Sequence, residues 1–140
     1  MKKKKVMLMS VLAGGLMMSC GSTKKAATVA DLVGEWEVME VDNKPVSAEE
    51  TPFLGYNVSE GQFYGNTGCN SLMATIKVSE SAGELSFDAV GSTKRMCADM
   101  ATEDAILQAL GAVKGFTLEG EKLVLNNADG NELMELKKKP

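Results

Sequence analysis

The N-terminal 19 residues constrain this chain most, because they separate a leader from the part that folds. Lys2 to Lys5 form a positively charged block, and an uncharged apolar stretch of 13 residues follows from Val6 to Met18. A helix of that length reaches only about 20 Å, well short of the roughly 30 Å hydrocarbon core of a bilayer. This combination is typical of a signal peptide. We therefore expect residues 1–19 to be an export signal.

The sequence around Cys20 resembles a lipobox, the site at which a lipoprotein is cleaved and acylated. Leu16-Met17-Met18-Ser19-Cys20-Gly21 places small residues beside the cysteine, with Met17 where leucine is more usual. We expect Cys20 to carry the lipid and residues 20–29 to form a flexible tether. The alternative is an ordinary cleaved signal that leaves a free thiol. Because Gly21 is not the aspartate that retains lipoproteins at the inner membrane, we expect an outer-membrane protein. Ser22 to Lys25 lack the acidic residues associated with surface display, so we expect the domain to face the periplasm.

Removal of the leader makes the chain strongly acidic. Four of the 15 basic residues lie in the leader and none of the 19 acidic residues do, so 11 basic residues face 19 acidic ones, a formal charge of −8. Such a charge disfavours nucleic acid and anionic lipid headgroups as partners. We therefore expect attachment to the membrane through the lipid anchor, with another envelope protein as a possible partner.

Residues 30–137 are expected to form one domain, followed by a basic tail at residues 138–140. Short segments in which apolar and polar side chains alternate predict strands. They are residues 32–38, 62–64, 72–78, 84–88, 116–118, 123–125 and 133–136. The alternation slips at Met39–Val41, which predicts a bulge. Turns are predicted at Asp42–Pro45 and at Asp129-Gly130.

One amphipathic helix is predicted after residue 99. Its apolar face comprises Ala105, Ile106, Ala109, Leu110 and Val113, whereas Glu103, Asp104, Gln108 and Lys114 lie away from that face. Asp99 or Thr102 is expected to cap its start, and Lys114-Gly115 to end it. Strands, one helix and further strands favour an α+β fold: a curled antiparallel β-sheet, or partial barrel, with the main α-helix packed against it.

Two short signatures stand out within the predicted domain. They are Gly65-Asn66-Thr67-Gly68-Cys69-Asn70 and Ser92-Thr93-Lys94-Arg95-Met96-Cys97-Ala98-Asp99, the second directly ahead of the acidic helix. Together with Trp36 near the domain start, they resemble the META domain, HslJ-like family of heat-shock lipoproteins, with Ala98 where that family usually has proline. The resemblance covers about residues 30–136 and implies an envelope protein linked to heat stress and antibiotic tolerance. It implies no established reaction and no catalytic residues.

Cys69 and Cys97 are the only cysteines left once Cys20 is lipidated, so a single pairing exists. Beyond the inner membrane the compartment is oxidising, which favours a disulfide. The bridge would close a loop of about 29 residues and stabilise the fold by about 3–4 kcal/mol. The alternative is a pair of reduced cysteines that pack as small apolar side chains.

The composition disfavours catalysis. The chain has no histidine, the commonest general base and metal ligand. A Ser-Lys pair of Ser71 or Ser92 with Lys94 has no distinguishing spacing. Two cysteines with carboxylates make a poor zinc site, and a calcium loop starting at Leu125 lacks its first and twelfth ligands. We therefore expect neither an enzyme nor a metal or other cofactor.

The adjacent basic residues Lys94 and Arg95 lie within the second signature of an acidic protein. They could seat a carboxylate or phosphate of a partner. The alternative is a solvated loop whose charges offset nearby acids. The five methionines beyond the leader, Met39, Met73, Met96, Met100 and Met134, are expected mostly to fill the core.

The leading interpretation is a non-enzymatic module that binds another envelope protein or supports envelope integrity under stress. The alternative is a lipoprotein that holds a lipid or small apolar ligand between the sheet and the helix. That alternative requires an open pocket lined by residues such as Leu110, Phe116 and Leu125. A hydrolase without a recognisable active site is the third interpretation.

Overall fold

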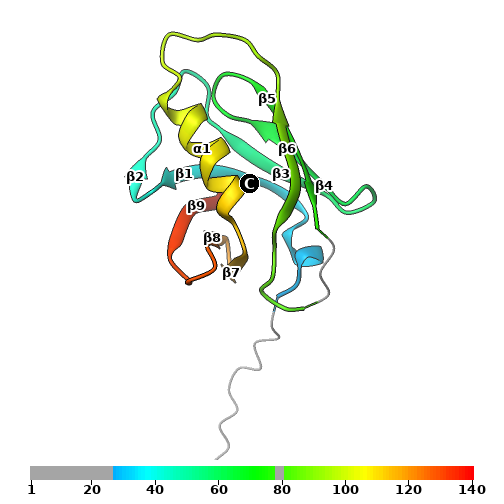
Figure 1. Ribbon diagram of the computed structural model, residues 1–140. Coiled ribbons are helices and arrows are strands. Elements are labelled where there is room, and N and C mark those ends of the chain that lie inside the picture. Colours follow the sequence, from blue (N-terminus) through cyan, green and yellow to red (C-terminus); the bar gives the residue numbers. More distant parts are fainter. Residues whose placement is uncertain (1–26, 78–80) are drawn as a thin grey trace, which may run out of the picture.

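The computed structural model describes residues 27–77 and 81–140. The predicted signal peptide, Cys20 and most of the predicted tether lie outside these residues. Within the described part, nine strands form one antiparallel sheet that curls into a partial barrel, and an α-helix packs against its open side (Figure 1). The predicted α+β fold is confirmed. No helix in the described residues has the length and hydrophobicity needed to cross a membrane.

A short 3-10 helix precedes the strands, and the α-helix interrupts them after the sixth. In chain order the elements are η1 (Val29–Leu32), β1 (Gly34–Val41), β2 (Lys44–Pro45), β3 (Phe53–Asn57), β4 (Gln62–Asn66), β5 (Ser71–Ile76), β6 (Phe87–Ser92), α1 (Ala101–Ala112), β7 (Gly115–Glu119), β8 (Lys122–Asn126) and β9 (Glu132–Lys138).

The strand order is β6-β5-β4-β3-β1-β9-β8-β7, with β2 paired to β1 outside this path. The two ends of the sheet approach each other, because a bridge joins Glu84 to Gly115. The N–H of Phe116 also donates to the C=O of Gly83 at 2.9 Å. Helix α1 contacts β1, β6 and β9, so it lies across the open side of the curl (Figure 1).

The core lies where the concave face of the sheet meets α1. Ile106 and Leu110 of the helix are buried together with Trp36 and Leu136 of the sheet. The indole N–H of Trp36 donates to the C=O of Leu32 at 3.0 Å, which satisfies the polar atom of this buried ring. The predicted apolar helix face therefore does pack against the sheet.

The first hairpin follows the sequence closely. The register of β1 against β9 shifts between Val38 and Glu40, so the predicted bulge is confirmed. Asp42 and Asn43 then have φ angles of 54° and 63°, as expected for a two-residue hairpin turn. Strand β2 begins directly after them, so the turn predicted for residues 42–45 is confined to its first half.

Two strands differ from the prediction. Strand β3 was not predicted, because Leu54, Gly55 and Tyr56 are all buried and the strand therefore lacks alternation. The strand predicted at residues 84–88 is displaced: continuous pairing with β5 begins at Phe87 and runs to the end of β6. Leu85 is nevertheless buried in the core, which explains why the alternation there suggested a strand.

Two further predictions are wrong. Most of the five methionines beyond residue 19 were expected to fill the core, yet Met39, Met73 and Met96 are 42%, 57% and 80% exposed. Lys138, predicted to begin a basic tail, is the last residue of β9 and pairs with β1. Lys139 also donates its backbone N–H to the C=O of Glu35 at 2.9 Å, because sheet pairing continues almost to the end of the chain.

A polar cluster on the convex face fastens this C-terminal segment. The ring of Tyr64 covers Gly55, where a Cβ atom would clash with it. The hydroxyl of Tyr64 donates to Oε2 of Glu35 at 3.0 Å, and the Lys139 ammonium lies 3.2 Å from Oε1 of the same carboxylate. These hydrogen bonds, from Lys139 first and then from Tyr64, lower the pKa of Glu35.

Glu35→Gln is expected to remove a small pH-dependent part of the stability. A lowered pKa in the folded state contributes stability above the ordinary pKa of 4.5, and this contribution disappears as the pH falls through the lowered value. Because the cluster is partly exposed, we expect a difference below about 1 kcal/mol at pH 7. Urea unfolding between pH 2.5 and 7 would measure it. A constant difference across this range would contradict the assignment, and Tyr64→Phe should give a smaller effect of the same sign.

Candidate functional site

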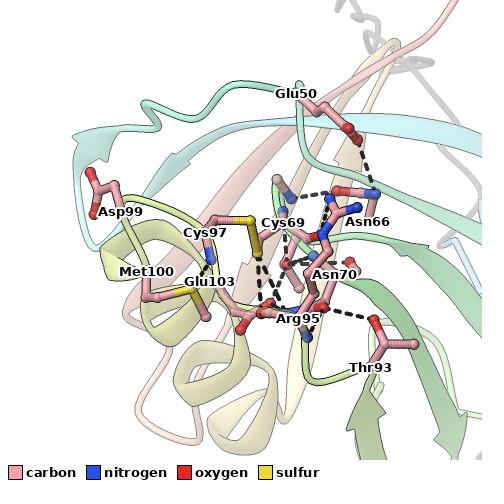
Figure 2. Close-up of a disulfide and its surroundings, with 12 residues drawn as sticks. Glu50, Asn66, Cys69, Asn70, Thr93, Arg95, Cys97, Asp99, Met100 and Glu103 are labelled. Atoms are coloured by element: carbon pink, nitrogen blue, oxygen red, sulfur yellow. Dashed lines mark hydrogen bonds between the residues drawn. A yellow bond between two sulfur atoms is a disulfide. The ribbon is translucent and has the colours of Figure 1, made fainter.

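The two signatures meet in space at the ends of β4 and β6 (Figure 2). Cys69 and Cys97 form a disulfide with their Cα atoms 6.0 Å apart, so the predicted bridge is confirmed. Cys69 is 4% exposed, and Cys97 is partly exposed. The disulfide fastens the turn between β4 and β5 to the segment that precedes α1.

The turn after β4 needs glycine at one position. Gly68 has a φ of 97°, and an added Cβ would lie 2.6 Å from the Cβ of Ala48. The N–H of Gly68 donates to Oδ1 of Asn66 at 2.6 Å. Asn66 in turn donates to the Glu50 carboxylate at 3.3 Å. These contacts give the Gly and Asn residues of the first signature structural roles.

Asn70 holds the two signatures together. Asn70 is 2% exposed. Its side-chain amide pairs with both the N–H and the C=O of Arg95, as the backbone of an adjacent β-strand does. Its Oδ1 accepts the backbone N–H of Arg95 at 2.7 Å, and its Nδ2 donates to the backbone C=O of Arg95 at 2.9 Å. The hydroxyl of Thr93 also donates to Oδ1 at 2.8 Å. Both backbone groups of Arg95 are therefore fixed by one buried amide (Figure 2).

The first turn of α1 supplies a buried carboxylate to the same cluster. Glu103 is 6% exposed. Its Oε1 accepts hydrogen bonds from the hydroxyl of Thr67 at 2.6 Å and from Nδ2 of Asn70 at 2.7 Å. The prediction that Glu103 lies away from the buried face is therefore wrong. The carboxylate links the start of the helix to the turn after β4, where polar donors compensate for its burial.

The helix start also differs from the predicted capping. Met100 is the N-cap residue and makes no side-chain cap hydrogen bond. Asp99 nevertheless accepts the N–H of Ala101 at 2.8 Å, so one predicted candidate does bind a backbone N–H at this end. Thr102, the other candidate, donates to the C=O of Ser47 at 2.9 Å and thereby fastens α1 to the segment after β2.

The segment Thr93–Cys97, here called the 93–97 loop, carries the predicted partner-binding residues. Lys94 and Arg95 are both exposed, and neither forms an ion pair with a described carboxylate. One guanidinium nitrogen of Arg95 donates to the C=O of Cys69 at 2.9 Å. Met96 beside them is 80% exposed. The loop thus presents two cations and an apolar side chain on a backbone that the cluster holds in place.

The cluster encloses only a small hollow. A hollow of about 60 Å³ borders the disulfide, Thr67 and Glu103, which is space for one or two water molecules. Throughout residues 27–77 and 81–140, no three His, Cys, Asp or Glu side chains are grouped so that they could hold a metal ion. The backbone N–H of Ser71 donates to the hydroxyl oxygen of Thr93, and the backbone N–H of Thr93 donates to the C=O of Ser71, at 3.1 Å each. These two hydrogen bonds join β5 to the loop.

A much larger hollow lies at the other end of the partial barrel. It has a volume of about 790 Å³ and is bordered by Trp36, Phe116 and Leu118, with Asp31 and Glu119 at its margin. β7, which supplies one wall, is an edge strand of the sheet. This hollow is an open groove with both apolar and acidic walls.

The centre of the contact between the sheet and α1 is closely packed. Leu110 and Leu125 are each 1% exposed, and both belong to the continuous core. Phe116 is 4% exposed and only borders the groove. Leu110 and Leu125 therefore do not line an open pocket as the ligand-binding alternative required, although a hollow of about 320 Å³ lies between residues 41–47 and the start of α1.

Sequence reasoning missed Thr67, Asn70 and Glu103 as the residues that organise this region. A signal for Glu103 was present, because it precedes Ile106 by three residues and Leu110 by seven. This spacing places it on the buried stripe of the helix. Thr67 and Asn70 lay within the first signature, but their partners are 36 and 25 positions away in the sequence, and no local pattern identifies them.

Comparison with protein families gives one match: the model of the META domain matches residues 30–140. No protein with a curated description matches the chain.

Three solved structures have similar folds. A protein studied by NMR is 21% identical, with a TM-score of 0.62, over 80% of this chain and 95% of that one. An NMR structure from Burkholderia xenovorans is 16% identical, with a TM-score of 0.61, over 91% and 99%. A crystal structure of a DUF4847 family protein from Bacteroides vulgatus is 11% identical, with a TM-score of 0.59, over 81% and 100%. At these identities the likeness concerns the fold alone.

Proposed function

The chain belongs to the META domain family, and from this premise we propose that it is an envelope lipoprotein whose META domain binds another envelope protein and catalyses no reaction. The anchor is the lipid on Cys20, after removal of residues 1–19. The location is the outer membrane, with the domain facing the periplasm. The role is support of the envelope under stress, including heat and antibiotics.

The binding role is supported by the hydrogen bonds that the two signatures make. Asn70, Thr67 and Glu103 bond to one another and to the backbone of the 93–97 loop, so their polar groups serve to support structure. As a result, the backbone of the 93–97 loop is fixed while its side chains are exposed. A preorganised surface of this kind suits binding, because little conformational freedom is lost when a partner docks.

The 93–97 loop and the N-terminal end of the described domain lie at opposite ends of the molecule (Figure 1). η1, the first described element, lies at the lower end of the domain, whereas the segment between β6 and α1 lies at the upper end (Figure 1). An anchor that precedes η1 would attach at the end of the domain opposite the 93–97 loop and leave this loop accessible. The domain would then meet partners in the surrounding compartment.

Lipidation is tested by comparing the intact chain with Cys20→Ser. Acyl chains bind membranes with about 0.8 kcal/mol per buried CH₂ group. We therefore expect incorporation of labelled palmitate and recovery with membranes for the unaltered chain, and loss of both for Cys20→Ser. Mass spectrometry would show whether the mature N-terminus is Cys20. An unmodified thiol or an intact leader would contradict the proposed anchor and location.

Partner binding is tested in cells with a photo-crosslinking amino acid placed at one exposed apolar position at a time. Val58, Met73 and Met96 are suitable, because they are 54%, 57% and 80% exposed and replacement should leave the core intact. We expect the same discrete adduct with one envelope protein from one position or from adjacent positions. Absence of an adduct from every position, with normal protein levels, would contradict the binding role.

A second candidate function rests on the groove at the opposite end of the barrel. Its volume of about 790 Å³ and its walls of Trp36, Phe116 and Leu118 could hold an apolar ligand. Leu118→Glu would place a charge in this wall. Binding of a fluorescent fatty acid that this variant loses would favour the second function, and absence of binding by the unaltered protein would remove it.

A further inference from the structure

The 93–97 loop has an uncommon charge for its setting. Arg95 is the only arginine in the chain, and it adjoins Lys94 in a protein with a formal charge of −8 after leader removal. Neither cation forms an ion pair with a carboxylate of the described residues. The alternative was that the two cations offset nearby acidic side chains. No ion pair within the described residues supports it. The two cations retain most of their hydrogen-bonding capacity for an external anion.

The loop also exposes an apolar side chain that no internal packing explains. Met96, at 80%, has the largest exposed fraction among the exposed large hydrophobic residues described. It lies between Arg95, whose backbone is bound on both sides by Asn70, and Cys97, which is fixed by the disulfide. The cost of ordering this side chain for binding is therefore reduced, since its backbone is already held. Methionine suits such a contact because its side chain adapts to the surface that it meets.

We propose that Lys94, Arg95 and Met96 form a docking surface for an extended segment of another envelope protein, in which carboxylates flank an apolar side chain. This inference rests on the proposed binding function and names the chemistry of the partner. Carboxylates would pair with Lys94 and with the free guanidinium nitrogens of Arg95, while the apolar side chain covers Met96. Charge complementarity selects an acidic protein segment, and the loop lies at the end of the domain opposite η1, so the proposed anchor does not cover it (Figure 1).

The test uses three fluorescent 12-residue peptides and the full mature lipoprotein in nonionic detergent. One peptide alternates Glu and Asp with Leu and Phe, the second replaces the acids by Lys, and the third keeps the acids but replaces the apolar residues by Ser. We expect fluorescence anisotropy to show binding of the first peptide alone, and to show weaker binding as salt is raised from 0.05 to 0.5 M.

Loop variants and matched controls locate the binding. Lys94→Glu and Met96→Ser should each weaken binding of the first peptide by about tenfold, from loss of a charge pair with new repulsion and from loss of apolar burial. Lys114→Glu makes the same charge change and Val58→Ser a similar apolar change at exposed positions elsewhere. These controls should stay within twofold of the unaltered protein. Arg95 is left in place, because its guanidinium also bonds to Cys69.

Several results would overturn the inference. The first is failure of the acidic, apolar peptide to bind, and the second is equal binding by the loop variants and the control variants. The third is binding of the Cys20→Ser protein to phosphatidylglycerol vesicles, if the added change Lys94→Glu abolishes that binding. The crosslinking map separates this inference from the general proposal. An adduct at Val58 or Met73 without one at Met96 keeps a binding function but rejects this surface, whereas no adduct at any position rejects both.

Discussion

Asn70→Ala should lower the free energy of unfolding by about 3–5 kcal/mol. The variant would leave Glu103 with one donor fewer, in a site where the carboxylate is 6% exposed. It would also remove the partners of the backbone N–H and C=O of Arg95. The buried Glu103 carboxylate that loses a donor costs about 1–3 kcal/mol. The partly buried backbone groups of Arg95 add to this cost, and loss of a buried network is among the most damaging single changes. Urea unfolding followed by tryptophan fluorescence of Trp36 would measure the change.

A matched control is available in another asparagine turn. Asn127 accepts the backbone N–H groups of Asp129 and Asn131 at 2.9 Å each, but it serves an exposed hairpin. Asn127→Ala should therefore cost about 1 kcal/mol or less. If Asn70→Ala and Asn127→Ala proved equally mild, the role given to the Asn70 cluster would be wrong.

Loss of the Cys69–Cys97 disulfide should destabilise the protein by about 3–4 kcal/mol. The bridge joins positions 28 residues apart, and a loop of that size restricts the unfolded chain by about this amount in the chain-entropy model. The variant Cys69→Ala with Cys97→Ala removes the bridge without leaving a buried thiol. Its unfolding curve should coincide with that of the unaltered protein kept in reductant. A change below about 1 kcal/mol would contradict the prediction.

Hydrogen exchange separates these two effects. Without the disulfide, Asn70 still binds both backbone groups of Arg95, so the N–H of Arg95 should remain protected in the native state. In Asn70→Ala the disulfide remains, but this N–H loses its acceptor and should exchange quickly. Equal protection in both variants would show that Asn70 does not hold the 93–97 loop. The same measurement predicts which variant loses peptide binding, because docking depends on a fixed loop.

Several features were available from local sequence. The alternation around Trp36, the bulge at Met39 and the helix face containing Ile106 and Leu110 were predicted and are present. These features depend on near neighbours in the chain, since periodicity and turn chemistry act over a few residues. The disulfide was also predicted, because elimination left one pair and the expected compartment favoured its oxidation.

The sequence by itself determined that this is an α+β chain with a curled antiparallel sheet and one helix, and it left a single possible cysteine pair within the domain. Only the tertiary structure decided the strand order, the burial of Glu103 and the use of Asn70 to hold Arg95. The contacts that the first signature makes with the second signature and with α1 join residues between 23 and 36 positions apart. Such contacts depend on which strands become neighbours and in which register, and those are set by packing of the whole core, which no local pattern of side chains encodes.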